Sequence, residues 1–141
     1  MTTRREAILA RIATQLGSVA GVSGRVYRSR VVPLARGESP AVVVEPRNDQ
    51  SVQTVIPRID WTLNVAVMVI VRGDTPDQLA DPIVASLHQL MMADQTLGGY
   101  SQSIEPQGVS FEMIEADQPA GVVTCEYNVR YQTSLTDQTT L

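Results

Sequence analysis

The sequence is poor in cysteine, in lysine and in long apolar runs, and each absence excludes a class of protein. The single cysteine, Cys125, allows no intrachain disulfide and no cysteine cluster for zinc, so we expect a chain made in a reducing cytoplasm. The longest apolar run, 65–71, is far shorter than the about 20 residues of a membrane-spanning helix. The first residues interrupt their apolar pieces with arginine and glutamate, unlike a signal peptide. These features predict a soluble protein without membrane contact.

The charge balance argues against a general nucleic-acid binder. Every one of the 11 basic residues is arginine, yet 15 acidic residues leave a net charge of -4. A chain that binds phosphate without sequence preference carries a basic excess instead. With 141 residues, of which 43% are hydrophobic, the chain is long enough to bury one core without disulfides or metals. We therefore expect a single globular domain.

The stretch 58–71 predicts the central strand of this domain. Every second residue is apolar, which is the period of a strand with one face on a core: Ile59, Trp61, Leu63, Val65, Val67, Val69 and Val71. The other face turns apolar in its second half, at Ala66, Met68 and Ile70. Fourteen extended residues span about 45 Å, whereas a compact domain of this length is roughly 37 Å across. A strand that outruns its core and has a second apolar face is typical of a subunit in a larger assembly.

The remaining elements predict an α+β fold, with an antiparallel-rich sheet of about five strands and two helices packed on one face. The order is α-β-β-β-α-β-β within one domain, 1–134, followed by a flexible tail, 135–141. Thr3 and Glu6 form a capping box for the first helix, which we expect to end near Leu16. The other strands are expected at 26–32, 41–45, 109–115 and 123–132.

Two prolines set further expectations. Pro46 is expected to stop the strand at 41–45, which leaves 46–57 as a long mobile loop. The second helix is expected to begin at Thr75, and Pro82 to kink it or to mark a second start capped by Asp81. Its apolar stripe is expected to comprise Leu79, Ile83, Leu87, Leu90 and Met91.

Residues able to carry chemistry are few, and a structural role is the better interpretation of each. His88 has no partner that the sequence can place beside it, and Cys125 lies on the core face of the last strand. Asp74, Asp77 and Asp81 suit the positive end of a helix dipole better than a cation site. The acidic residues Glu112, Glu115 and Asp117 are expected on a solvated strand edge. We predict no catalytic, cofactor or metal site.

The densest basic stretch consists of four arginines around Tyr27: Arg25, Arg28, Arg30 and Arg36. Phosphate contact is one interpretation, and a subunit contact or a solvated face is the one that the acidic chain favours.

Three segments together resemble one known family. These are 58–73, the stretch DTPDQLADPIVASLHQLMMADQTLGG at 74–99, and AGVVTCEYNVRYQTS at 120–134. They resemble the tail terminator, or tail completion, proteins of long-tailed bacteriophages, also called minor tail protein U-like. Members of that family are small α/β proteins that form a hexameric ring on the end of a finished tail tube. The ring stops tube polymerisation and presents the surface that joins the head.

The resemblance implies a structural, non-enzymatic virion protein of the tail and neck, assembled in the host cytoplasm without a cofactor. Its partners would be copies of itself, the tail tube protein and a head-tail connector or neck protein, and DNA would pass through the lumen without specific binding. The expected subunit interface comprises Ala66, Met68, Ile70, Arg28 and Arg30, and the loop expected to contact the tube or a neighbour comprises Arg47, Gln53, Val55, Ile56 and Arg58. Two alternatives are another neck protein and, from a different class, a small oligomeric ligand-binding or enzymatic domain.

Overall fold

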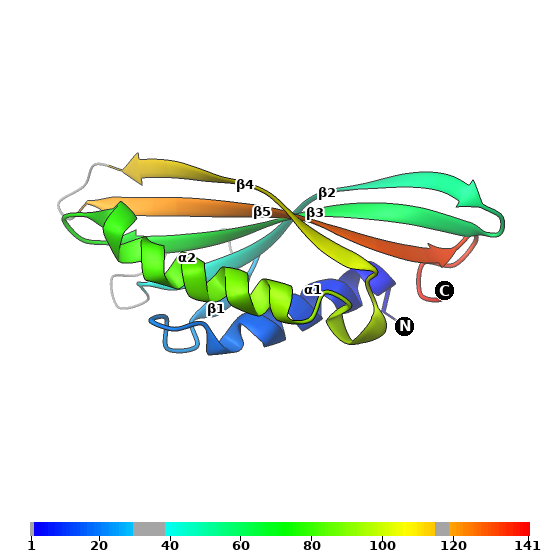
Figure 1. Ribbon diagram of the computed structural model, residues 1–141, viewed down its shortest axis with the longest axis horizontal. Coiled ribbons are helices and arrows are strands. Elements are labelled where there is room, and N and C mark those ends of the chain that lie inside the picture. Colours follow the sequence, from blue (N-terminus) through cyan, green and yellow to red (C-terminus); the bar gives the residue numbers. More distant parts are fainter. Residues whose placement is uncertain (1, 30–38, 115–118) are drawn as a thin grey trace.

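A five-stranded sheet covered on one face by two helices makes up the fold (Figure 1). The computed structural model describes residues 2–29, 39–114 and 119–141, with the backbone alone at 54, 55 and 114. The elements follow in the order α1 (Arg4–Gln15), β1 (Val26–Arg28), β2 (Ala41–Val55), β3 (Arg58–Arg72), α2 (Pro76–Ala93), β4 (Ser103–Ile114) and β5 (Ala120–Ser134), with short 3-10 turns at Leu16–Ser18 and Leu97–Gly99. The predicted class and element order are confirmed.

The strands lie in the order β1-β2-β3-β5-β4, with β3 at the centre as its alternation predicts. Only β1 and β2 run parallel, and every other neighbouring pair is antiparallel. In the middle of the sheet Val67 lies between Val44 of β2 and Cys125 of β5. Both helices lie on the same side of this sheet (Figure 1).

The core fills the space between the helices and the sheet. The alternate apolar residues of β3 from Leu63 to Val71 face it, and so do Val42 and Val44 of β2 and the residues of β5 from Val123 to Tyr131. From the helices, α1 contributes Ile8, Leu9 and Ile12, and α2 contributes Ile83, Leu87 and Met91. None of the helices in the described residues has the length and apolar character to cross a membrane.

The first helix begins as its sequence predicts. The Thr3 hydroxyl accepts a hydrogen bond from the Glu6 backbone N–H at 3.1 Å, which satisfies one of the free donors of the first turn. The Glu6 carboxylate does not return to complete a capping box. It accepts two hydrogen bonds from the Arg28 guanidinium instead, at 2.6 and 2.9 Å, and so ties α1 to β1.

The segment 46–57 is a strand and a turn, so the prediction of a mobile loop is wrong. β2 continues through Pro46 to Val55, and a turn at Ile56 and Pro57 leads directly into β3. Proline is tolerated because β1 pairs with β2 only from Val42 to Val44, so that beyond Val44 the N–H side of β2 is free of a ladder partner among the described strands. The pairing with β3 shifts register between Pro46 and Asn48. β2 and β3 thus form one long hairpin, whose turn lies at the far right of Figure 1.

Three smaller expectations are also corrected. Pro82 lies inside α2, which continues from Pro76 to Ala93, so Asp81 starts no second helix, and a kink at Pro82 stays a prediction. Leu79 is 46% exposed, and Pro76 and Ala80 take its place in the buried stripe. β1 ends at Arg28 rather than at residue 32, where Ser29 adopts a positive φ of 48° that a strand cannot continue.

Candidate interaction surfaces

The residues whose side chains could take part in chemistry have structural roles instead. His88 lies on α2, and its Nδ1 is 3.0 Å from the hydroxyl of Tyr127, whose side chain is buried. The histidine therefore supplies a partner for a phenol that would otherwise be buried without one. Cys125 is buried beside it, and burial raises the pKa of its thiol, so it is not a ready nucleophile.

The acidic residues do not converge. Within the ranges that the structure describes, no three His, Cys, Asp or Glu side chains are grouped as metal ligands. Asp74, Asp77 and Glu112 are exposed. Glu115 and Asp117, from the acidic stretch considered above, lie outside the described residues.

The middle of the long hairpin is held to α1 by a polar and aromatic network. The Asp49 carboxylate of β2 accepts hydrogen bonds from Arg5 of α1, at 2.7 Å, and from the hydroxyl of Tyr131 of β5. The Arg5 guanidinium lies 5.6 Å from the centre of the Trp61 ring, which stacks on Tyr131 at 6.2 Å. Trp61 in turn donates a hydrogen bond to Thr133 at 2.9 Å. Three strands and a helix thus fix the direction in which the hairpin projects.

The end of that hairpin, residues 52–58, exposes apolar side chains to solvent, and we call it the hairpin tip. Ile56 is 79% exposed and Val52 61%, and Gln53 and Arg58 are exposed beside them. The tail also reaches this end, because the Leu135 N–H donates to the Pro57 carbonyl at 2.6 Å. The flexibility expected for the tail stays a prediction. A side chain that is as apolar and as exposed as Ile56, held at a projecting turn, is suited to insertion into a partner.

A second apolar surface lies at the opposite end, between α2 and β4, and we call it the edge groove. Val109 and Phe111 of β4 point to the helix side of the sheet, level with Cys125 and Val123 of β5. The two side chains are nevertheless 51% and 64% exposed, because α2 does not extend over β4. The groove includes a hollow of about 360 Å³ that Val84 and His88 of α2 border, with Pro106, Val109 and Cys125 among the residues opposite.

Gly121 allows the start of α2 to approach β5 closely. A Cβ on Gly121, at the start of β5, would come within 2.6 Å of the Pro76 side chain at the start of α2. Its absence lets the helix pack directly on β5. Towards β4, the helix then presents Asp77, Asp81 and Val84 along the groove.

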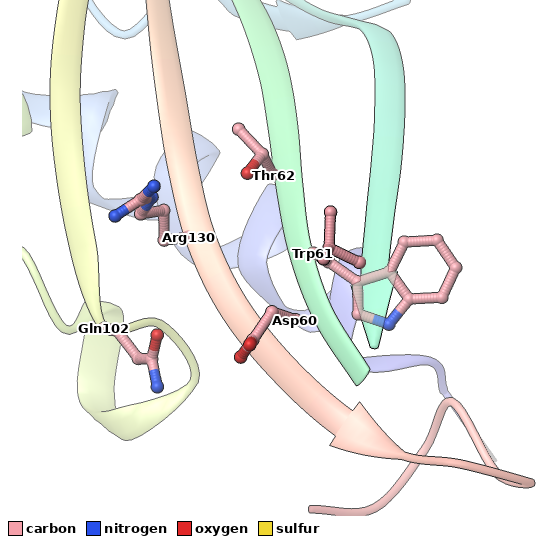
Figure 2. Close-up of a pocket in the computed structure, with 6 residues that line it drawn as sticks. Asp60, Trp61, Thr62, Gln102 and Arg130 are labelled. Atoms are coloured by element: carbon pink, nitrogen blue, oxygen red, sulfur yellow. The ribbon is translucent and has the colours of Figure 1, made fainter. Parts of the chain in front are cut away.

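A polar hollow of about 310 Å³ lies beside the outer half of the hairpin, next to Val52 and Trp61 (Figure 2). Asp60 and Thr62 of β3 and Arg130 of β5 line it, with Gln102 from the segment before β4. Asp60 accepts a hydrogen bond from Gln132 at 2.6 Å. The presence of side chains of both charges fits a protein contact better than a substrate site.

Comparison with known proteins gives a fold but no family. No family model and no curated protein matches the sequence. Among solved structures, the chain is similar to one described as "Virion of native gene transfer agent (GTA) particle", with a TM-score of 0.69 and 12% identity. The match covers 88% of this chain and 93% of that one. The two chains therefore share a fold along almost their whole length.

Of the residues of the expected interface, Ala66, Met68 and Ile70 lie on the sheet face away from the helices, whereas Arg28 lies on the helix side, level with Val44. Met68 and Ile70 are half-buried there, whereas Ala66 is fully buried. Arg28 is engaged by Glu6, and Arg30 lies outside the described residues, as does Arg36 of the basic stretch. An interface on this face stays a prediction.

The residues expected in a contact loop are spread along the long hairpin. Arg47, near its middle, lies 3.9 Å from Glu45 and 4.0 Å from the Met68 sulfur. Gln53, Ile56 and Arg58 gather at the tip, while Val55 is described by its backbone alone, paired with Arg58.

The sequence pattern did not predict the edge groove. The alternation of Val109, Phe111 and Met113 correctly indicates one face of a strand, but it predicts that this face is core. Only the strand order reveals that β4 is an edge strand that the helices leave uncovered.

Proposed function

We propose that this chain is a structural protein of a phage-like virion, and that it acts as a tail terminator. Copies would form a ring, hexameric in the family that the sequence resembles, that caps the tail tube, stops its polymerisation and offers a surface for head joining. The observation that carries the proposal is the long hairpin of β2 and β3, which is fixed near its middle and exposes apolar side chains at its tip. The fold shared with a chain of a gene transfer agent virion supports it.

The proposed mechanism is geometric and requires no catalysis or cofactor. The hairpin is already formed in the single chain, so little conformational entropy is lost when it meets a neighbour or the tube. The half-buried face around Met68 and Ile70 provides a second contact area. The net charge of -4 suits a lumen through which DNA passes, because a mildly negative wall does not retain phosphates.

The test is to measure the mass of the protein in solution by light scattering, alone and after mixing with tail tubes from the same source. Negative-stain images of the tube ends accompany the measurement. A ring on one end of each tube, and tubes that no longer elongate, are the expected results. Binding to portal complexes instead of tubes would reassign the chain to another position in the neck. A protein that stays indifferent to both would contradict a role in the head-tail junction.

A further inference from the structure

The hairpin tip and the edge groove lie at opposite ends of the molecule. In Figure 1 the turn between β2 and β3 is at the far right, whereas the end of β4 and the start of α2 are at the left. One chain therefore cannot fill its own groove with its own tip. Two different surfaces at opposite ends are the arrangement that joins copies head to tail, and such a contact closes into a ring when the rotation between copies is suitable.

The two surfaces also match in chemistry. The tip offers the apolar side chains of Val52 and Ile56, and the groove offers Val109 and Phe111, all more than half exposed. Arg58 is the one charged residue of the tip, whereas Asp77 and Asp81 line the groove beside Phe111. Across the described part of the chain, none of these three charged side chains has an ion-pair partner.

We propose that the hairpin tip of one copy docks in the edge groove of the next, with Ile56 against Phe111 and Arg58 facing Asp77 and Asp81. The inference rests on the proposed function in one respect, namely that copies of the chain assemble into a ring, and it names the two surfaces that join them. A narrow tip buries less area than a typical stable interface, so each contact is weak alone. Closure of the ring, in which every subunit uses both surfaces, makes the assembly stable.

Cysteine cross-linking tests the contact directly. Two full-length variants, Ile56→Cys and Phe111→Cys, are mixed under mild oxidation, alone and with tail tubes. A disulfide requires Cβ atoms about 4 Å apart, so it reports the proposed pair and few others. The native Cys125 is buried and can stay. We expect a cross-linked dimer in the mixture, little from either variant alone, and a ladder of covalent multimers from the double variant.

The matched control replaces Phe111→Cys with Gln89→Cys, an exposed position on α2. Mixed with Ile56→Cys, it should give no more dimer than random collision does. Cross-linking of Ile56→Cys with itself, or equal yields with both partners, would overturn the inference. So would the absence of the Ile56–Phe111 cross-link both in free protein and on tubes.

Charge exchange provides an independent readout. Arg58→Asp should weaken association about tenfold, and Asp81→Arg should do likewise, because each places like charges together. The two changes combined in one chain should recover most of the loss. Failure of the double variant to recover would contradict the proposed register of the contact.

The outcomes separate this inference from the terminator role. Rings that cap tubes but give no Ile56–Phe111 cross-link would refute the contact and leave the role intact. Cross-linked multimers that do not bind tubes would support the contact between the hairpin tip and the edge groove and would contradict the tail terminator role.

Discussion

The guanidinium of Arg5, near the start of the chain, lies 2.7 Å from the carboxylate of Asp49, halfway along the long hairpin. The Asp49 side chain is only 10% exposed, and the buried hydroxyl of Tyr131 donates to the same oxygen. Hydrogen bonding to Asp49 raises the pKa of Arg5, which means that the pair favours the charged form. This contact holds the hairpin in the direction in which its tip projects.

Asp49→Ala should therefore lower the free energy of unfolding by about 3 kcal/mol, because it leaves both Arg5 and Tyr131 without their acceptor. Urea denaturation of the purified protein measures the change. The control Glu105→Ala removes an exposed carboxylate of β4 and should change stability by about 0.5 kcal/mol at most. Equal effects of the two substitutions would mean that the network contributes little.

Two leucines of α2 test the observed position of its buried stripe. Leu87 is fully buried, so Leu87→Ala should cost about 3 kcal/mol of unfolding free energy through lost burial and the cavity that remains. Leu79 is 46% exposed, so Leu79→Ala should cost about 1 kcal/mol or less. Thermal unfolding of both variants gives the comparison, and similar losses would restore Leu79 to the core.

Local patterns were enough to predict the elements whose residues decide their own conformation. The unbroken alternation of β3, with Leu63 to Val71 buried on one face, required no knowledge of the remaining chain. Thr3 caps α1 because its hydroxyl needs only a backbone N–H three residues later. The resulting fold class and order agree with the structure.

The expectations that were wrong depended on neighbours that a sequence does not identify. Pro46 would stop a central strand, but it is accepted where one side of the strand has no ladder partner, as on β2 beyond Val44 among the described strands. Phe111 has the period of a core residue but belongs to an edge strand. Arg5 and Asp49 are 44 positions apart, and no spacing rule connects them.

Glu6 makes stability depend on pH. Hydrogen bonds from Arg28 lower the pKa of the Glu6 carboxyl below its ordinary value of 4.5. A carboxyl with a depressed pKa in the folded state stabilises the fold above the pKa of the unfolded chain, and this contribution is lost as the pH falls through the folded value. We expect the wild type to lose stability below about pH 4.5, and Glu6→Gln to lose less over the same interval.

The measurement is thermal unfolding of both proteins at neutral and acid pH. The difference between them is modest, because the Glu6 side chain is 47% exposed and water screens the pair. Asp94 and Asp137 also have lowered pKa values, because they accept hydrogen bonds from Thr96 and Thr139, so the variant keeps part of the pH dependence. Identical pH profiles for wild type and variant would exclude a role for the Glu6 pair.

The sheet face away from the helices gives the last prediction. Met68 is half-buried between Val43 and Thr124 on the neighbouring strands, and the Arg47 guanidinium lies 4.0 Å from its sulfur. An aspartate at this position keeps access to water and gains a cation nearby, so Met68→Asp should leave a folded chain. The same charge would be desolvated against an apolar partner, so ring formation should be lost.

Circular dichroism measures whether the Met68→Asp variant folds, and light scattering measures whether it still forms rings. Met68→Leu, which keeps an apolar side chain of similar volume, should fold and assemble like the wild type. If Met68→Asp unfolds, this face belongs to the core of the single chain. If it folds and still forms rings, the subunits meet elsewhere, and the contact between the hairpin tip and the edge groove must account for the assembly without it.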